Sequence, residues 1–324
     1  MPDTRLRSRF FRSNLRDRTL AMLARAFRRV LLIELIIYMV LGWCLVRYAG
    51  WLWIEAAAAA IACAVAMRAF GIAATFVIAR RYASPTPPEL RPGLLGWLRL
   101  YLAELGAYIV IYNLYLPFEP LLMGAETLQP LPPGRLPVLL VHGYVCNRGF
   151  MLPLRRYLSE HGVSAYSHNL EPVYSDIDGY ADALAQRIED ICAATGADKL
   201  VILAHSMGGL AARACLRKHG ARRVAKLITL GTPHHGTALA RLGAGANGRQ
   251  MVPGNAWLKR LNEAAPAVPT VCVFSHQDNI VSPQDSAMLE GAKIVGLSGM
   301  GHVSMPFSRH IREIALAEIQ AVSR

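Results

Sequence analysis

The chain has 324 residues, so it exceeds the roughly 100–200 residues usual for one domain and has room for an additional module. Hydrophobic residues make up 53% of it, and its formal net charge is +13. Nine arginines lie between Arg5 and Arg29, whereas the chain from Glu126 onward is only mildly basic. A basic head directly before an apolar span is typical of a cytoplasmic N-terminus, which argues against nucleic-acid binding. A solvated tail is the alternative.

The apolar excess lies in the first 125 residues and predicts a helical membrane hairpin. Residues 30–46 are short for a crossing, but Arg29 and Arg47 can reach the headgroups. Residues 51–78 are long enough to return, and Arg80 and Arg81 repeat the positive charge. No cleavage pattern cleanly follows the first apolar run, so we expect the anchor to stay attached. We predict a basic segment at 1–29 and a transmembrane hairpin at 30–82, in a bacterial inner membrane with a cytoplasmic N-terminus.

Two features of this region are ambiguous. Arg68 lies near one end of its helix, packs inward or marks a break near Gly71, and a side chain extended towards the headgroups is its simplest explanation. After a proline-rich linker, residues 94–116 have the length of a crossing, but Arg99 and Glu104 interrupt them. If they cross, the following domain faces away from the cytoplasm. If they lie flat or pack on that domain, it stays inside, and we slightly favour this arrangement for the segment 83–135.

From residue 136 the pattern changes to short apolar runs that alternate with amphipathic stretches. This rhythm predicts an α/β domain at 136–324, with a mostly parallel sheet flanked by helices. We expect a helix over 178–194 that is capped by Gly196. The expected buried strands are 138–141, 199–204, 226–230, 270–274 and 293–297.

The strongest chemical signal is the run from Ala204 to Gly208, which departs by one methyl group from the pattern GxSxG. It follows an expected strand and precedes a helical stretch. In that context Ser206 would occupy a strained strand-to-helix turn that exposes a nucleophilic hydroxyl.

A serine nucleophile needs a base and an acid, and in this class of site they follow in the order Ser, Asp or Glu, His. Asp278 and His302 each follow an expected strand in that order. His302 would accept the serine proton, and Asp278 would orient the imidazole. Asp285 is the rival acid, but the preceding Ser-Pro pair suggests that it opens a helix.

The negative charge of the reaction intermediate needs hydrogen-bond donors. We expect the backbone amide of Met207, directly after the nucleophile, to be one of them. The backbone amide of Tyr144, in the loop after the first strand, is the expected second donor.

The chain resembles the bacterial true lipases of the α/β-hydrolase superfamily through residues 136–304. The motifs that carry the resemblance are His142-Gly143, Ala204-His205-Ser206-Met207-Gly208-Gly209 and Gly231-Thr232-Pro233-His234-His235-Gly236-Thr237. The resemblance implies an α/β-hydrolase fold, supports Tyr144 and Met207, and places a lid after the last motif.

Residues 239–261 are the candidate lid, and an ordinary packed loop and helix is the equal alternative. Some of these lipases hold calcium, but residues 303–310 contain no acid, so we expect no metal and no cofactor. His234 and His235 more simply support a loop than bind a metal. The six cysteines form no recognisable disulfide or zinc pattern.

These observations predict a membrane-anchored serine hydrolase that cleaves carboxylic esters of lipophilic acyl chains through an acyl-Ser206 intermediate. Its partners would be a lipid or other acyl ester and the bilayer. The same triad can serve an acyltransferase, a thioesterase or an amidase, because it does not select the leaving group. A non-catalytic, membrane-tethered binding module is the alternative of a different class.

Overall fold

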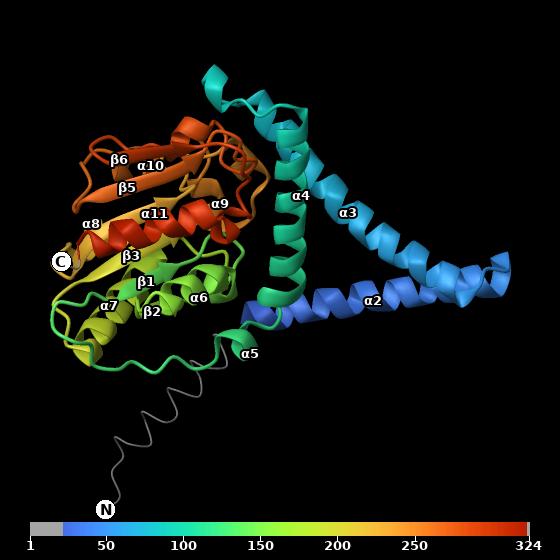
Figure 1. The fold of residues 1–324 in the computed structure, drawn as a ribbon, viewed down its shortest axis with the longest axis horizontal. Coiled ribbons are helices and arrows are strands. Elements are labelled where there is room, and N and C mark those ends of the chain that lie inside the picture. Colours follow the sequence, from blue (N-terminus) through green and yellow to red (C-terminus); the bar gives the residue numbers. More distant parts are fainter. Residues whose placement is uncertain (1–21, 323–324) are drawn as a thin grey trace, which may run out of the picture.

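The computed structural model describes residues 22–322. Most of the expected basic segment at 1–29 therefore lies outside the described residues. From residue 136 the chain forms a six-stranded parallel sheet with the strand order β2-β1-β3-β4-β5-β6 (Figure 1). The strands are β1 (Val138–Val141), β2 (Ala165–His168), β3 (Leu200–His205), β4 (Val224–Leu230), β5 (Thr270–Ser275) and β6 (Lys293–Leu297).

The five strands expected from the sequence are all present, with ends shifted by at most two residues. Two details differ. Strand β2 was not predicted, because its residues Ala-Tyr-Ser-His are not an apolar run. The interpretation of β6 as a buried strand was wrong: it pairs only with β5 at the edge of the sheet, and its residues are exposed or half-buried.

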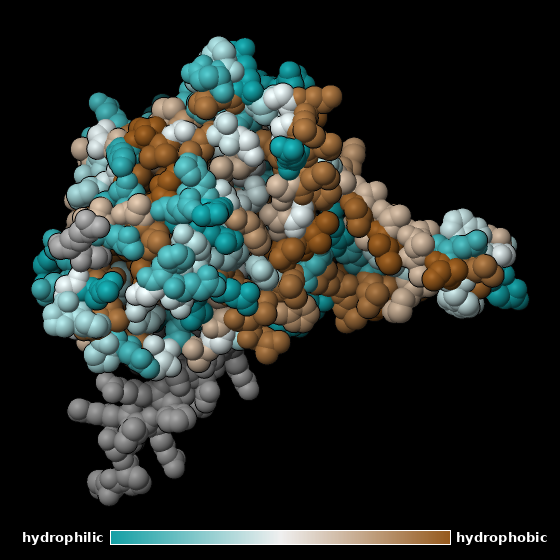
Figure 2. Space-filling view, in the orientation of Figure 1, coloured by the Kyte–Doolittle hydropathy of each residue, from teal (hydrophilic) through white to brown (hydrophobic). Residues whose placement is uncertain are grey.

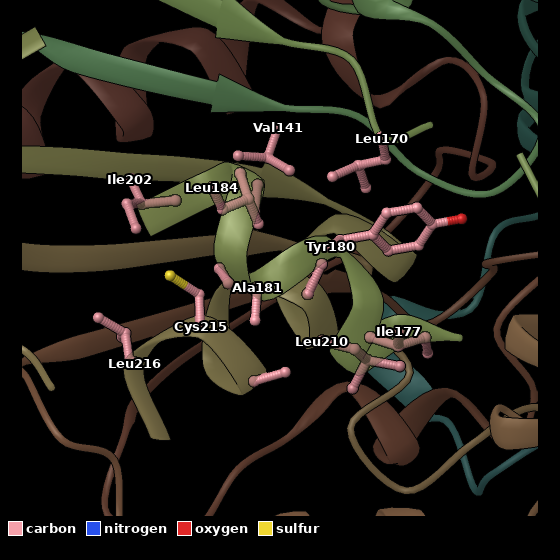
Figure 3. Packing of buried hydrophobic residues seen from close by; sticks show 14 of the residues in the cluster. Val141, Leu170, Ile177, Tyr180, Ala181, Leu184, Ile202, Leu210, Cys215 and Leu216 are labelled. Atoms are coloured by element: carbon pink, nitrogen blue, oxygen red, sulfur yellow. The ribbon is translucent and has the colours of Figure 1, made fainter. Parts of the chain in front are cut away.

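Helices cover both faces of the sheet. One face packs against α7 (Ala181–Thr195) and α8 (Met207–His219), and the other against α6 (Leu152–Glu160) and α11 (Arg309–Gln320). Figure 3 shows Val141 and Ile202 from the strands beside Leu184 of α7 and Leu210 of α8. The predicted helix and cap are confirmed, since α7 ends at Gly196, whose φ of 73° only glycine adopts readily. Apolar packing on both faces explains the continuous apolar character of β1 and β3.

Three long apolar helices precede this domain. They are α2 (Met22–Ala49), α3 (Trp53–Arg81) and α4 (Leu94–Val110), which continues as a π-helical turn η2 (Ile111–Tyr115). Each is long and apolar enough to cross a membrane by length and composition. In Figure 1, α2 and α3 diverge from their connection towards the α/β domain, and α4 runs beside that domain. Hydrophobic side chains are concentrated on these helices in Figure 2.

The third helix has one buried face. Leu100, Glu104, Ala107 and Ile111 are buried against the rest of the protein, while Arg99 points to the exposed side. The two charges that interrupt this apolar segment therefore have different surroundings. The buried face shows that α4 packs on the α/β domain.

Arg68, a charged residue within α3, packs against other parts of the protein. Arg68 donates hydrogen bonds of 2.7 and 2.8 Å to the two carboxylate oxygens of Glu34 on α2, and one of 2.8 Å to Asn113 in η2. The helix continues without a break at Gly71. Arg68 thus joins three helical segments, and the headgroup-reaching interpretation of its side chain was wrong.

Shorter helices complete the described chain. A 3-10 turn, η1 (Pro88–Leu90), lies in the proline-rich linker, and α5 (Glu119–Met123) follows η2. The remaining helices of at least six residues, α9 (Gly245–Gln250) and α10 (Ala256–Leu261), follow β4. The six cysteines are all free thiols.

Candidate active site

Ser206 lies on a strained turn between β3 and α8. Its φ of 54° and ψ of −130° are unusual for a residue with a side chain. The turn is fixed by hydrogen bonds, because Ser206 N–H donates to the Leu230 carbonyl at 2.9 Å and the Thr232 hydroxyl donates to the Ser206 carbonyl at 2.9 Å. A rigid turn of this kind presents the hydroxyl at the carboxyl edge of the sheet, as the sequence pattern predicts.

The small residues around Ser206 are required by close packing. A Cβ atom at Gly143 would lie 2.8 Å from Ser206 Cβ, and one at Gly208 would lie 2.7 Å from the Val141 carbonyl oxygen. A Cβ at Gly209 would collide with the Thr232 side chain. The glycines thus let β1, the serine turn and α8 approach one another. The close approach of Gly209 to Thr232 therefore gives a packing reason for these two residues, which belong to the lipase-like motifs.

Asp278 and His302 meet at the ends of β5 and β6. The Asp278 Oδ2 atom lies 2.8 Å from His302 Nδ1, and both side chains are buried. The other carboxylate oxygen accepts hydrogen bonds of 2.8 Å from the backbone N–H groups of Ile280 and Val281. Asp278 is therefore held in a fixed orientation that can set the imidazole tautomer.

The rival acid lies elsewhere. Asp285 is exposed in the short 3-10 turn η6 (Gln284–Ala287), and its backbone N–H is bonded to the Ser84 hydroxyl. The structure thus places Asp278 beside His302, and Asp285 on the surface.

Ser206 and His302 face the same cavity. Among the described residues, no hydrogen bond joins the Ser206 hydroxyl to the imidazole, so the acid–histidine half of the predicted triad is the part formed in this conformation. Serine–histidine hydrogen bonds in such sites are often looser without substrate. Convergence of all three groups remains a prediction.

The electrostatics of the site favour a basic imidazole. Burial alone would lower the pKa of His302, but the charge and hydrogen bond of Asp278 and the charge of Glu104 raise it above its ordinary value of 6.5. A neighbouring ring behaves differently. Burial is the main cause that holds the pKa of His205 well below 6.5, and the charge of nearby His302 is the second. The His205 imidazole is therefore neutral.

The two expected oxyanion donors lie beside Ser206. Met207 begins α8, where the first backbone N–H groups have no acceptor within the helix. Tyr144 lines the cavity that contains Ser206, next to Val145 with its unusual φ of 49°. The sequence analysis left His142 without a separate role. Its Nδ1 atom lies 2.9 Å from the Gly143 carbonyl and its Nε2 accepts from Leu170 N–H at 3.0 Å, which fixes this loop.

Tyr144 has a second contact that the sequence did not indicate. Its hydroxyl donates to the Ala244 carbonyl at 2.7 Å and accepts from Ala244 N–H at 2.8 Å. The loop expected to supply an oxyanion donor is therefore linked to the candidate lid at 239–261. That segment is packed in this conformation, as the alternative interpretation expects, with the following side chains buried: Met251, Trp257, Leu258 and Leu261.

The adjacent histidines have structural surroundings. The His234 Nδ1 atom lies 3.3 Å from Arg213, and Nε2 lies 3.3 Å from the Thr229 hydroxyl. His235 contacts Asn262 at 3.2 Å. The two rings thus bind different partners on neighbouring elements. Among residues 22–322, no group of three metal-ligating side chains is close enough to hold an ion.

Helix α3 contacts the loop that carries the acid, a contact that was not predicted from the sequence. Asn279 accepts from His302 N–H at 3.0 Å and donates to the Thr75 hydroxyl of α3 at 2.8 Å. The Ser282 hydroxyl donates to the Ala79 carbonyl of α3 at 2.7 Å. The two contacts with α3 join residues about two hundred positions apart, so no local pattern could have revealed them.

Comparison with known proteins agrees with this geometry. Residues 136–247 match the family described as alpha/beta hydrolase fold. Triacylglycerol lipases from Pseudarthrobacter phenanthrenivorans and Burkholderia plantarii are each 34% identical over 114 residues, which are 33% of this chain and 35% and 32% of those proteins. The chain therefore spans about a third of the length of these curated relatives.

Solved structures support the fold over a longer stretch. A mature lipase from Bacillus licheniformis aligns with a TM-score of 0.53 at 18% identity, over 60% of this chain and 96% of that one. Lipase B from Aspergillus fumigatus aligns with a TM-score of 0.53 at 21% identity, over 58% and 53%. The parallel sheet and these matches show that the domain from residue 136 has an α/β-hydrolase fold. Within it, the matched segment is lipase-like in sequence.

Proposed function

We propose that the protein is a membrane-anchored serine ester hydrolase that acts on carboxylic esters of lipophilic acyl chains. The observation that carries this proposal is the arrangement at one cavity of Ser206, on its strained turn, and His302, whose far nitrogen is bonded to Asp278. The relatives named as triacylglycerol lipases support an ester as the substrate class. The apolar helices beside the site support a lipid.

In the first half of the reaction, Ser206 Oγ attacks the ester carbonyl carbon while His302 Nε2 takes the hydroxyl proton. This step requires the two groups to come within hydrogen-bond reach when substrate binds. The carbonyl oxygen becomes negatively charged and accepts hydrogen bonds from the backbone amides of Tyr144 and Met207. Asp278 stabilises the imidazolium through the contact at Nδ1.

The tetrahedral intermediate then collapses. The bond to the alcohol oxygen breaks, and His302 gives its proton to the leaving alcohol, which leaves the acyl group on Ser206. Water attacks the acyl-enzyme with His302 again as the base. Release of the carboxylic acid regenerates the serine hydroxyl, so atoms and charge balance over the cycle.

A fluorophosphonate probe tests the nucleophile in the full chain. We expect the probe to label the wild-type protein, and labelling to be lost in Ser206→Ala but kept in Ser159→Ala, a substitution at an exposed serine of α6. Hydrolysis of a series of p-nitrophenyl esters of increasing acyl length should follow the same pattern. A folded wild-type protein that neither reacts with the probe nor hydrolyses any ester would contradict the proposal.

A further inference from the structure

The cavity at Ser206 extends well beyond the α/β domain. It has a volume of about 980 Å³, and its wall includes Ser206 and His302 at one part and side chains of α2 and α3 at another. Much of the wall from these two helices is apolar: Val30, Ile33, Ile37, Leu41, Met67 and Ile72. The candidate lid at 239–261 contributes no residue to it. The long helices therefore supply much of the apolar wall.

The length of the cavity fits a lipid tail. The residues of α2 that line it run from Phe27 to Leu41, which is roughly 21 Å of helix at 1.5 Å per residue. One leaflet of a bilayer core is roughly 15 Å thick. In Figure 1, α2 and α3 spread apart towards the α/β domain, and the part of the cavity wall that this domain supplies includes Ser206.

The charges in this wall are paired with one another. Arg68 and Glu34 both line the cavity, and two hydrogen bonds of 2.7 and 2.8 Å join them. Asn113 accepts a further hydrogen bond from Arg68 at 2.8 Å. The guanidinium therefore has its charge neutralised within the protein. A neutral, largely apolar wall favours hydrocarbon over an anionic headgroup.

The outer surfaces of the same helices are also apolar. Leu32 and Ile36 of α2, and Phe70 of α3, are exposed and do not line the cavity. If the hairpin lies in a bilayer, lipid surrounds these outer surfaces, and the cavity lies between two helices that themselves contact acyl chains. A tail can then reach Ser206 without passing through water.

We propose that this cavity is an acyl-chain site built by the membrane hairpin, and that a fatty acyl chain of a bilayer lipid ester enters it laterally between α2 and α3. This inference rests on the proposed hydrolase function, because it assigns the tail of the ester that Ser206 attacks. The long helices thus have a role beyond anchoring: they select long acyl chains and deliver the ester bond to the serine.

Gly71 offers a test that leaves the catalytic residues intact. It lines the cavity, and a Cβ atom built there meets nothing within 4 Å, so a larger side chain can start there without a backbone clash, and we expect Gly71→Leu to occupy cavity space. Gly106→Leu is the matched control. A Cβ at Gly106 also meets nothing within 4 Å, but Gly106 does not line the cavity. Leucine is a better helix former than glycine, so neither variant should disrupt its helix.

The experiment compares p-nitrophenyl palmitate and p-nitrophenyl acetate with the full-length protein in lipid nanodiscs. For Gly71→Leu we expect kcat/KM for palmitate to fall roughly tenfold or more, while the value for acetate stays within about twofold of wild type. Gly106→Leu should leave both unchanged. Equal losses for both esters in Gly71→Leu, or no loss for palmitate, would overturn the inference.

A binding measurement separates this inference from the proposed function. A diazirine-bearing palmitoyl ester should cross-link to peptides of α2 and α3 in the Ser206→Ala protein, and Gly71→Leu in that background should reduce the yield several-fold. This result supports the acyl site even if the wild-type protein hydrolyses no ester. Cross-links confined to residues outside the cavity would reject the site even if hydrolysis is observed.

Discussion

The Glu104 carboxylate accepts a hydrogen bond of 2.8 Å from the backbone N–H of Val303, the residue that follows His302. Its second oxygen accepts from Ser304 N–H at 2.9 Å, and the side chain is fully buried. Glu104 lies on α4, a mostly apolar helix, nearly two hundred residues before the loop that it holds. The helix therefore fixes the backbone on which the histidine is carried.

Replacing Glu104 should impair catalysis through the position of His302. Glu104→Leu leaves two buried N–H groups without acceptors, at a cost of roughly 1–3 kcal/mol each, whereas Glu104→Gln keeps one acceptor oxygen. We expect kcat to fall more in the leucine variant than in the glutamine variant, with little change in KM. Arg99→Gln, at an exposed position of the same helix, is the control. An unchanged kcat in folded Glu104→Leu would refute this positioning role.

The sequence was informative where chemistry and local pattern coincide. The strand-to-helix turn at Ser206 was recognisable because a small-residue turn is a local feature, and five strands were recognisable as apolar runs. The role of α4 was not, because the partners of Glu104 lie in a distant loop. Length and hydropathy describe such a helix equally well as a crossing or as a packed element.

Partners across the fold also explain the other omissions. No partner for Arg68 was predicted from the sequence, because Glu34 lies one helix earlier in the chain. Chain order alone left both Asp278 and Asp285 open. The Ser-Pro pair before Asp285 favoured Asp278, and the folded loop places Asp278 beside His302 and Asp285 on the surface. In both cases, hydrogen bonds between distant parts of the chain identify the partner: Glu34 for Arg68, and Asp278 for His302.

The two acids give a matched test of the triad. Asp278→Asn keeps the shape of the side chain but removes the charge that stabilises the imidazolium and favours the correct tautomer, so we expect kcat to fall by about 10⁴-fold. Asp285→Asn should retain nearly full activity, because Asp285 is exposed. Initial rates on a short-chain ester measure both. Loss of activity in Asp285→Asn with a fully active Asp278→Asn would reverse the assignment.

The reaction rate should depend on the protonation of His302. Only the neutral imidazole accepts the serine proton, so fluorophosphonate labelling should accelerate as the pH rises through the pKa of His302. That pKa lies above 6.5 because the Asp278 and Glu104 charges outweigh the effect of burial. We expect a midpoint above pH 6.5 in wild type and a lower one in Asp278→Asn. A wild-type midpoint below 6.5 would contradict the electrostatic argument.

The raised pKa of His302 also has a consequence for the stability of the fold. A group whose pKa is higher in the folded than in the unfolded state stabilises the fold fully below the unfolded value, and this contribution is lost as the pH rises through the folded value. His302 should therefore contribute stability near pH 5 to 6 that disappears at higher pH. Comparing the thermal midpoints of wild type and His302→Gln across this range measures the difference. A gap that widens as the pH rises would contradict the sign.

The Arg68–Glu34 pair should couple α2 to α3. Removing one partner leaves the other charge unpaired between apolar helices, so Arg68→Leu should lower the melting temperature more than the double variant Arg68→Leu/Glu34→Leu does. Unfolding of the purified protein in a mild detergent provides the measurement, with Ile61→Leu on the exposed side of α3 as the control. Additive losses in the double variant would mean that the pair carries no coupling.

The orientation of the protein in the membrane is the last prediction. Arg28 and Arg29 lie near the start of α2, and Arg80 and Arg81 end α3, so both ends of the hairpin are positively charged and belong on the cytoplasmic side. We expect the link to the domain to keep this side, because Glu104 of α4 is bonded to the histidine loop and the helix therefore packs on the domain.

We therefore expect the α/β domain to face the cytoplasm. The hairpin should keep the protein in the membrane during carbonate washing, and deletion of residues 1–82 should weaken that retention. In sealed inside-out vesicles of the inner membrane, added protease should digest the catalytic domain, whereas in right-side-out vesicles it should be protected. The reverse pattern would mean that α4 crosses the bilayer and that the contacts of Glu104 form on the opposite side.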